Sequence, residues 1–103
     1  MSKSPFPTGI ESIVLKLLLA KSEMYGLEMI KESAGRLKRG TIYVTLNRME
    51  EKGLIKSRSE KDPRDPGMPR RLYQITGAGQ RALNAWEFAA SGGQMNWGAA
   101  SYA

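Results

Sequence analysis

The chain of 103 residues contains neither cysteine nor histidine. Without cysteine it can form no disulfide and no thiolate zinc site. Without histidine it lacks the commonest general base, the usual partner of a nucleophilic serine and the usual nitrogen ligand of a metal. Glu50 and Glu51 are adjacent, so on a helix they would face different ways and could not act as an acid/base pair. We therefore expect no enzyme, no metal and no other cofactor.

Long hydrophobic runs are also absent. The longest, residues 13–20, is interrupted by Lys16 and falls far short of the roughly 20 apolar residues that span a bilayer. The first five residues lead into an amphipathic helix, and no small-residue cleavage site of a signal peptide follows them. We expect a cytoplasmic protein with no membrane partner.

Acidic residues are in the minority, with 10 Asp and Glu against 16 Lys and Arg, and the net charge is +6. This surplus favours a polyanionic partner such as double-stranded DNA. The length fits one domain with a modest core, and a hydrophobic content of 41% is ordinary for a globular protein. We expect this domain over residues 8–91, followed by a flexible tail over residues 92–103.

The first predicted helix opens with a capping box. Thr8 can accept a hydrogen bond from the third helical N–H, while Glu11 reaches back to the cap. The apolar residues that follow have the spacing of a helical core stripe, namely Ile10, Ile13, Val14, Leu17 and Leu18.

Two further helices are predicted before Gly53. The second covers residues 25–34, with Leu27 and Ile30 facing inward. The third runs from residue 39 or 40 to residue 52, and Gly53 is placed to cap its C-terminus. Its narrow buried stripe consists of Ile42, Leu46 and Met49.

The hydrophobic period changes after this third helix. Residues 54–59 and 70–75 predict two short strands, and three prolines in the loop of residues 61–69 forbid a central strand there. Thr76 caps a fourth helix that runs to about Ala90. The predicted fold class is therefore mainly α with a small β-hairpin. It is a winged helix-turn-helix with a three-helix core, a two-stranded wing and a C-terminal helix.

Basic residues gather where the third predicted helix begins. The free N–H groups and the dipole of that helix end favour phosphate, and in helix-turn-helix proteins this end enters the major groove. On the exposed side, Arg can pair with guanine, Asn with adenine and Val with a thymine methyl group, while a Tyr hydroxyl can hold a phosphate. The alternative is a solvated helix face whose charges only confer solubility. The candidates for DNA binding are Arg36, Lys38, Arg39, Thr41, Tyr43, Val44, Asn47 and Arg48.

The predicted wing is basic as well, with Lys61, Arg64, Arg70 and Arg71 against two aspartates. A wing beside the recognition helix can follow the DNA backbone or enter the minor groove, where Arg is favoured in narrow A·T tracts. We expect Lys61 and Arg64 to make the contacts at the tip. Because neighbours in a strand alternate, one of Arg70 and Arg71 should point away from DNA. The alternative is a solvated hairpin in which the aspartates neutralise neighbouring bases.

The fourth predicted helix is apolar over most of its circumference, and a domain of this size cannot cover it alone. We expect a twofold homodimer built from the first and fourth helices, with the recognition helices about 34 Å apart, one turn of DNA. The alternative is that Trp86 completes the core of its own chain. The expected dimer contacts are Ile10, Val14, Leu17, Ala82, Leu83, Trp86 and Ala89.

Two tryptophans suggest a small-molecule site. Trp86 and Trp97 can line a pocket for a flat hydrophobic or cationic ligand at the dimer interface. The alternative is that Trp97, which follows a Gly-Gly break, packs locally or not at all.

Four segments in the same order and spacing resemble the PadR family of bacterial transcriptional regulators. They are residues 25–30, 40–43, 46–55 and 67–79, and the resemblance covers about residues 10–90. It implies a homodimeric regulator, usually a repressor, which binds a palindromic promoter element and is often released by a small-molecule effector.

By position, the resemblance assigns particular residues to DNA binding. Gly40, Thr41 and Tyr43 match the family's recognition-helix signature, and Arg70 with Tyr73 matches its wing motif, so Gly40 and Arg70 join the candidates. The chain departs from the family where Tyr25 replaces a common His, Leu27 a common aromatic residue and Val44 a frequent Pro. Its C-terminal region is also short, which leaves the effector site reduced or absent.

A winged-helix module that binds proteins without touching DNA is the competing class. Such a module should expose apolar or acidic residues at the positions where this chain has Arg36, Lys38, Arg39 and Arg48.

Overall fold

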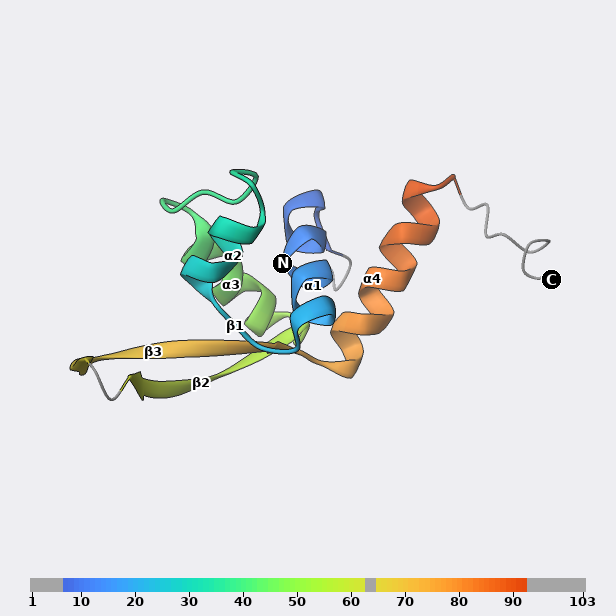
Figure 1. Cartoon of the computed structure of the whole chain (residues 1–103). Helices are drawn as coiled ribbons and strands as arrows, with labels where there is room; N and C mark the ends of the chain where they lie inside the picture. Colours follow the sequence, from blue (N-terminus) through green and yellow to red (C-terminus); the bar gives the residue numbers. More distant parts are fainter. Residues whose placement is uncertain (1–6, 63–64, 93–103) are drawn as a thin grey trace.

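The computed structural model describes residues 7–62 and 65–92, and the side chains of residues 7–61 and 70–92 among them. Three helices precede a β-hairpin, and a fourth helix follows it (Figure 1). The elements are α1 (Gly9–Lys21), β1 (Met24–Tyr25), α2 (Gly26–Glu32), α3 (Ile42–Glu51), β2 (Ile55–Asp62), β3 (Asp65–Ile75) and α4 (Gly77–Ala90). Within these described residues, no helix is long and apolar enough to cross a membrane. The predicted tail from Gly93 onward lies outside them.

The capping box at the start of α1 is confirmed. The Glu11 backbone N–H donates to Thr8 Oγ1 over 3.1 Å, and the Thr8 N–H donates to Glu11 Oε1 over 3.0 Å. The buried face of α1, however, is rotated from the predicted stripe, because Leu15 is fully buried while Ile10 is 45% exposed. Ser12 fits inside this face because its hydroxyl donates to the Gly9 carbonyl oxygen over 2.7 Å.

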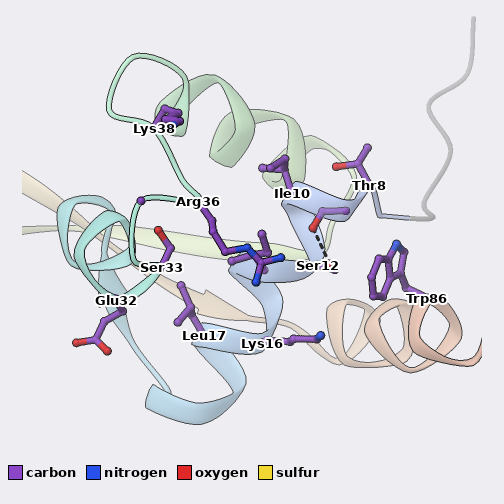
Figure 2. Close-up of a pocket in the computed structure, with 13 residues that line it drawn as sticks. Thr8, Ile10, Ser12, Lys16, Leu17, Glu32, Ser33, Arg36, Lys38 and Trp86 are labelled. Carbon is purple, nitrogen blue, oxygen red and sulfur yellow. Dashed lines mark hydrogen bonds between the residues drawn. The ribbon is translucent and has the colours of Figure 1, made fainter. Parts of the chain in front are cut away.

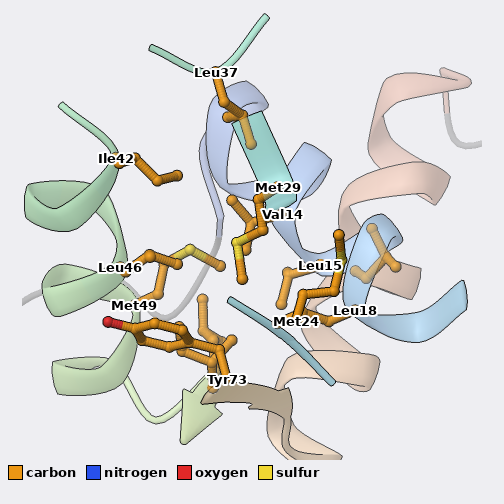
Figure 3. Close-up of a cluster of buried hydrophobic side chains, with 13 residues drawn as sticks. Val14, Leu15, Leu18, Met24, Met29, Leu37, Ile42, Leu46, Met49 and Tyr73 are labelled. Atoms are coloured by element: carbon orange, nitrogen blue, oxygen red, sulfur yellow. The ribbon is translucent and has the colours of Figure 1, made fainter. Parts of the chain in front are cut away.

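One hydrophobic core joins the helices to the sheet (Figure 3). The predicted stripe of α3 is confirmed, since all three of its residues are at most 1% exposed. The prediction for α2 is confirmed for Ile30, which packs against the core, but was wrong for Leu27, which is 51% exposed while Met29 is fully buried. The helix begins at Gly26, which packs beneath Tyr43, and this contact fixes which side of the short helix faces inward. The core consists of Val14, Leu15, Leu18, Met24, Met29, Leu37, Ile42, Leu46, Met49, Leu54, Ile55, Tyr73 and Leu83.

The sheet has three antiparallel strands in the order β1-β3-β2, so the predicted two-stranded hairpin gains a short edge strand. The predicted loop of residues 61–69 was wrong, because β3 already begins at Asp65 and includes Pro66 and Pro69. The strand tolerates both prolines because β1 pairs with β3 only at Leu72 and Tyr73. At the prolines, β3 borders β2 alone, and a strand with one neighbour does not need every N–H.

A buried ion pair connects α1 to the end of α3. Lys52 Nζ donates to Glu11 Oε1 over 2.7 Å, and the two side chains are 12% and 4% exposed. The same carboxylate oxygen accepts from the Thr8 cap, so one group fixes both the start of α1 and the position of α3.

The start of α4 is fixed against the end of α3. As predicted, Thr76 caps the helix: its hydroxyl accepts from the Gly79 N–H over 3.0 Å and donates to the Gly53 carbonyl oxygen over 2.6 Å. A side chain at Gly79 would collide with the Leu54 carbonyl oxygen, so the first turn of α4 lies directly against the backbone that enters β2.

Candidate nucleic-acid interface

The outward side of α3 carries the predicted reading residues. At 100° per residue, Val44 lies almost opposite the buried stripe, with Asn47 and Arg48 on either side of it. Val44 is 53% exposed, and Asn47 and Arg48 are exposed as well. The first turn of α3 contains no acidic residue, so nothing there opposes an approaching phosphate. The helix begins at Ile42, two or three residues later than predicted, with Thr41 as its N-cap.

Several candidates come together at the N-terminal end of α3. A hollow of about 240 Å³ lies between this end, the start of α1 and the connection between α2 and α3. Lys38, Thr41 and Arg48 line it. Arg39 and Gly40 lie beside them in the connection and are exposed. Lys38 and Arg39 thus lie just before a helix end whose dipole is already positive, whereas Arg48 borders the hollow from the last turn of α3.

Arg36 has a different position from its neighbours in the connection. It lines the small hollow, but it also lines a larger cleft beside α1. Figure 2 shows its side chain extending from the connection towards α1, between Ser33 and Ser12. Arg36 therefore borders both the hollow beside α3 and the cleft beside α1, and sequence spacing alone could not show this.

Tyr43 lies on the flank of α3, where it contacts α2. A Cβ added to Gly26 would lie 2.9–3.0 Å from the Tyr43 ring and its hydroxyl oxygen. Tyr43 is nevertheless 46% exposed. It therefore sets the spacing of the two helices of the helix-turn-helix and keeps an exposed edge.

The wing cations occupy different environments. Lys61 is exposed, and Arg64 lies outside the described residues. Arg70 lies over the ring of Tyr25, with 5.3 Å from its guanidinium carbon to the ring centroid. Arg71 Nη1 instead donates to Ser57 Oγ over 3.1 Å. Arg71 shares the two-residue period of Tyr73 and Ile75, which face the core.

A polar cluster ties the base of the wing to β1. Glu23 Oε2 accepts from Arg58 Nη1 over 2.8 Å and from Gln74 Nε2 over 2.6 Å. The hydrogen bond from Arg58 is the main reason why the pKa of the Glu23 carboxyl lies below its ordinary value. On the opposite face of the sheet, burial chiefly raises the pKa of the Tyr73 phenol, and the Glu50 carboxylate adds to this effect.

The larger cleft has a volume of about 920 Å³ and lies between α1, α4 and the connection (Figure 2). Ile10, Leu17 and Trp86 give it apolar walls. Lys16 Nζ lies 5.5 Å from the centre of the Trp86 ring and 3.7 Å from Glu87 Oε2.

The predicted dimer contacts divide into two groups. Ile10 and Ala89 are exposed and Leu17 and Trp86 are half-buried, so all four are accessible from outside. Val14 and Leu83 are at most 2% exposed and belong to the core of their own chain, which corrects their assignment. Ala82 also packs against this core and is half-buried. The other predicted ligand residue, Trp97, lies outside the described residues.

The fold is that of a winged helix-turn-helix protein. It has three packed helices, of which α3 exposes its outward side, and a hairpin beside them. The model of the Transcriptional regulator PadR-like family matches residues 14–85. The chain belongs to this family. Comparison with curated protein sequences gives no match.

Solved structures of similar proteins agree with this assignment. A protein from Thermoplasma acidophilum, assigned as a transcriptional regulator, is 33% identical with a TM-score of 0.69, and the match covers 80% of each chain. A PadR family transcription regulator from Clostridium difficile R20291 is also 33% identical, with a TM-score of 0.63 and coverage of 82% of this chain and 93% of that one. Bacillus subtilis PadR, solved with operator DNA, is 25% identical with a TM-score of 0.67, over 77% of this chain and 46% of that one.

Proposed function

We propose that the chain is a sequence-specific DNA-binding regulator that inserts α3 into the major groove and lays the wing along the adjacent backbone or minor groove. The observation that carries this proposal is the exposed side of α3, where Val44, Asn47 and Arg48 project beside a cationic helix end. The similarity to Bacillus subtilis PadR, which was solved with operator DNA, supports it.

The exposed side chains fit the chemistry of base edges. Arg48 can pair with the O6 and N7 of guanine through two parallel hydrogen bonds, and Asn47 can pair with adenine in the same way. Val44 can contact a thymine methyl group. Lys38 and Arg39 precede the helix, where their charges favour the phosphates that border the groove. Base readers on the helix and phosphate binders before it together provide sequence specificity and affinity.

The regulator acts as a homodimer on a palindromic promoter element. In a single chain, the apolar walls of the 920 Å³ cleft formed by Ile10, Leu17 and Trp86 remain accessible, and a second copy would cover them. A twofold pair presents two α3 helices to two half-sites, which therefore have opposite orientations. Occupation of a promoter by such a dimer would block transcription, so we propose that the protein is a repressor. We propose that it acts in the cytoplasm.

A small-molecule effector would bind beside Trp86, at the same cleft. The half-buried indole ring and its apolar neighbours suit a flat hydrophobic body. Lys16 already lies over this ring, which disfavours a cationic ligand on the same face. Binding there would act on the dimer and on the connection that leads to α3.

The first experiment is a mobility-shift assay with the DNA upstream of the chain's own gene, together with selection from a random-sequence pool. We expect one enriched palindromic element and binding to it that survives competition by scrambled DNA. Binding that is equally strong to all sequences would refute specific recognition. An absence of DNA binding would favour the protein-interaction module.

A pair of variants separates base reading from phosphate binding. Arg48→Ala should cost on the order of 1–3 kcal/mol at the selected element and relax the preference at one base pair. Lys38→Ala should weaken binding to selected and scrambled DNA alike. If both variants lose affinity equally for every sequence, Arg48 does not read a base.

A further inference from the structure

The two faces of the wing sheet carry different chemistry. Tyr73 and Ile75 of β3 face the helices, and Arg71 has the same parity in the strand. Arg70 lies on the opposite face, with Leu72 and Gln74. Two adjacent arginines therefore point to opposite sides of one sheet, and α3 lies on the side of Arg71.

Arg71 is linked to α3 by a short chain of hydrogen bonds. Its Nη1 donates to Ser57 Oγ over 3.1 Å, and the Ser57 hydroxyl donates to Glu50 Oε2 over 2.8 Å. Glu50 belongs to α3, so the position of the guanidinium is set relative to the recognition helix. Ser57 receives one of the five guanidinium N–H groups, and the planar fork can present another edge to a phosphate.

On the opposite face, the arginines are engaged by β1 and by acids. Arg70 lies over the Tyr25 ring, and the Tyr25 hydroxyl donates to Glu60 Oε1 over 2.8 Å. Arg58 Nη1 bonds to Glu23 over 2.8 Å, and its Nη2 lies 3.5 Å from Glu60. Two arginines and two glutamates thus balance on this face, and their contacts join the wing to β1.

We infer that Arg71 is the phosphate-binding arginine of the wing, that Ser57 positions it, and that Arg70 clamps the wing to Tyr25. This inference rests on the proposed function. If α3 inserts into the major groove, the DNA lies on the same side of the sheet as α3. Arg71 then meets the backbone strand that passes between α3 and the wing, while Arg70 lies behind the sheet. The assignment reverses the prediction that Arg70 contacts DNA.

The test compares Arg71→Ala with Arg70→Ala on the selected palindromic element and on scrambled DNA across a salt series. Arg71→Ala should weaken binding about tenfold on both DNAs and reduce the slope of log K against log salt by about one. Arg70→Ala should leave this slope unchanged and lower Tm by a few degrees. Arg71→Gln, which keeps a donor for Ser57 but loses the charge, should reproduce the loss of slope in a folded protein.

Ser57 provides the test of positioning. Ser57→Ala should weaken DNA binding severalfold at low salt, and Ser57→Thr, which restores a hydroxyl, should recover it. The inference is overturned if the salt slope is unchanged in both Arg71 variants, or if Arg70→Ala reduces it. The proposed function still stands in that case, provided that the wild type binds DNA specifically. A wild-type protein that binds no DNA specifically overturns both.

Discussion

The outward side of α3 and the cleft between α1 and α4 are two accessible surfaces of this small protein, and their side chains differ in chemistry. The α3 side presents exposed polar and cationic side chains from one chain, arranged at the end of a helix. The cleft presents Ile10, Leu17 and Trp86, which water solvates poorly. The first surface is formed by one chain and suits a polyanion, whereas the apolar walls of the second are the surface that the proposed second copy would cover.

The Lys52–Glu11 ion pair joins α1, which lines the cleft, to the end of α3, and breaking it should have the largest effect. Lys52→Met leaves a carboxylate that is 4% exposed without its cation, so we expect a loss of about 3 kcal/mol in the free energy of unfolding. Urea denaturation measures this loss. The matched control is the double variant Lys52→Met with Glu11→Gln, whose neutral amide can still accept from the Thr8 N–H and should recover part of the stability. A single variant that loses less than about 1 kcal/mol would contradict a structural role for the pair.

Trp86→Ala tests the cleft side of the comparison. An indole at the centre of a protein interface typically contributes at least about 2 kcal/mol, so the dissociation constant of the dimer should rise roughly thirtyfold or more. Sedimentation equilibrium at several protein concentrations measures it. Phe88→Ala is the control, because Phe88 is an exposed aromatic residue of α4 that does not line the cleft. A wild type that remains monomeric at micromolar concentration would remove the proposed dimer.

Lys61→Ala tests the DNA side at the exposed part of the wing. A lysine that binds one phosphate should contribute about 1 kcal/mol, equally for selected and scrambled DNA, and its loss should reduce the salt slope by about one. Arg81→Ala on α4 removes the same charge far from α3 and should leave the slope unchanged (Figure 1). Equal reductions in both variants would show that net charge, not the position of Lys61, governs binding.

Glu23→Gln tests the base of the wing and should have the smallest effect. The hydrogen bond from Arg58 is the main cause that lowers the pKa of the Glu23 carboxyl below its ordinary value. A carboxyl with a depressed pKa stabilises the fold above its unfolded pKa, and this contribution disappears as the pH falls through the folded value. The wild type should therefore have a slightly higher Tm than Glu23→Gln near pH 6, and the gap should narrow as acid titrates the Glu23 carboxyl. A gap that persists in acid would show that charge does not underlie it.

Local chemistry made much of the fold predictable. Residues within one or two helical turns specify the helix caps at Thr8 and Thr76 and the buried stripe of α3. The spacing of residues in the sequence is therefore enough to predict them. The strand β1 has only two residues and forms because β3 lies beside it. No local sequence pattern therefore predicts this strand. The exposure of Leu27 likewise depends on the contact between Gly26 and Tyr43 from another helix.

In the candidate site, too, local geometry predicts some features, and others depend on tertiary packing. Helical geometry alone predicts that Val44, Asn47 and Arg48 lie on the outward side of α3, because their exposure depends only on the buried stripe. The direction of Arg36 depends on how the connection packs near α1. The choice between Arg70 and Arg71 depends on which face of the sheet α3 covers, although strand parity with Tyr73 offered a signal.

The most direct test of the claim that α3 and the wing read DNA is a fluorescence-anisotropy titration of the wild-type protein. It uses the selected palindrome and a scrambled duplex of equal length, at about 50 and 200 mM salt. The account predicts much tighter binding to the palindrome at both salt concentrations, and a loss of affinity with salt that reflects several phosphate contacts. Equal affinities for the two duplexes, or binding that is insensitive to salt, would contradict it.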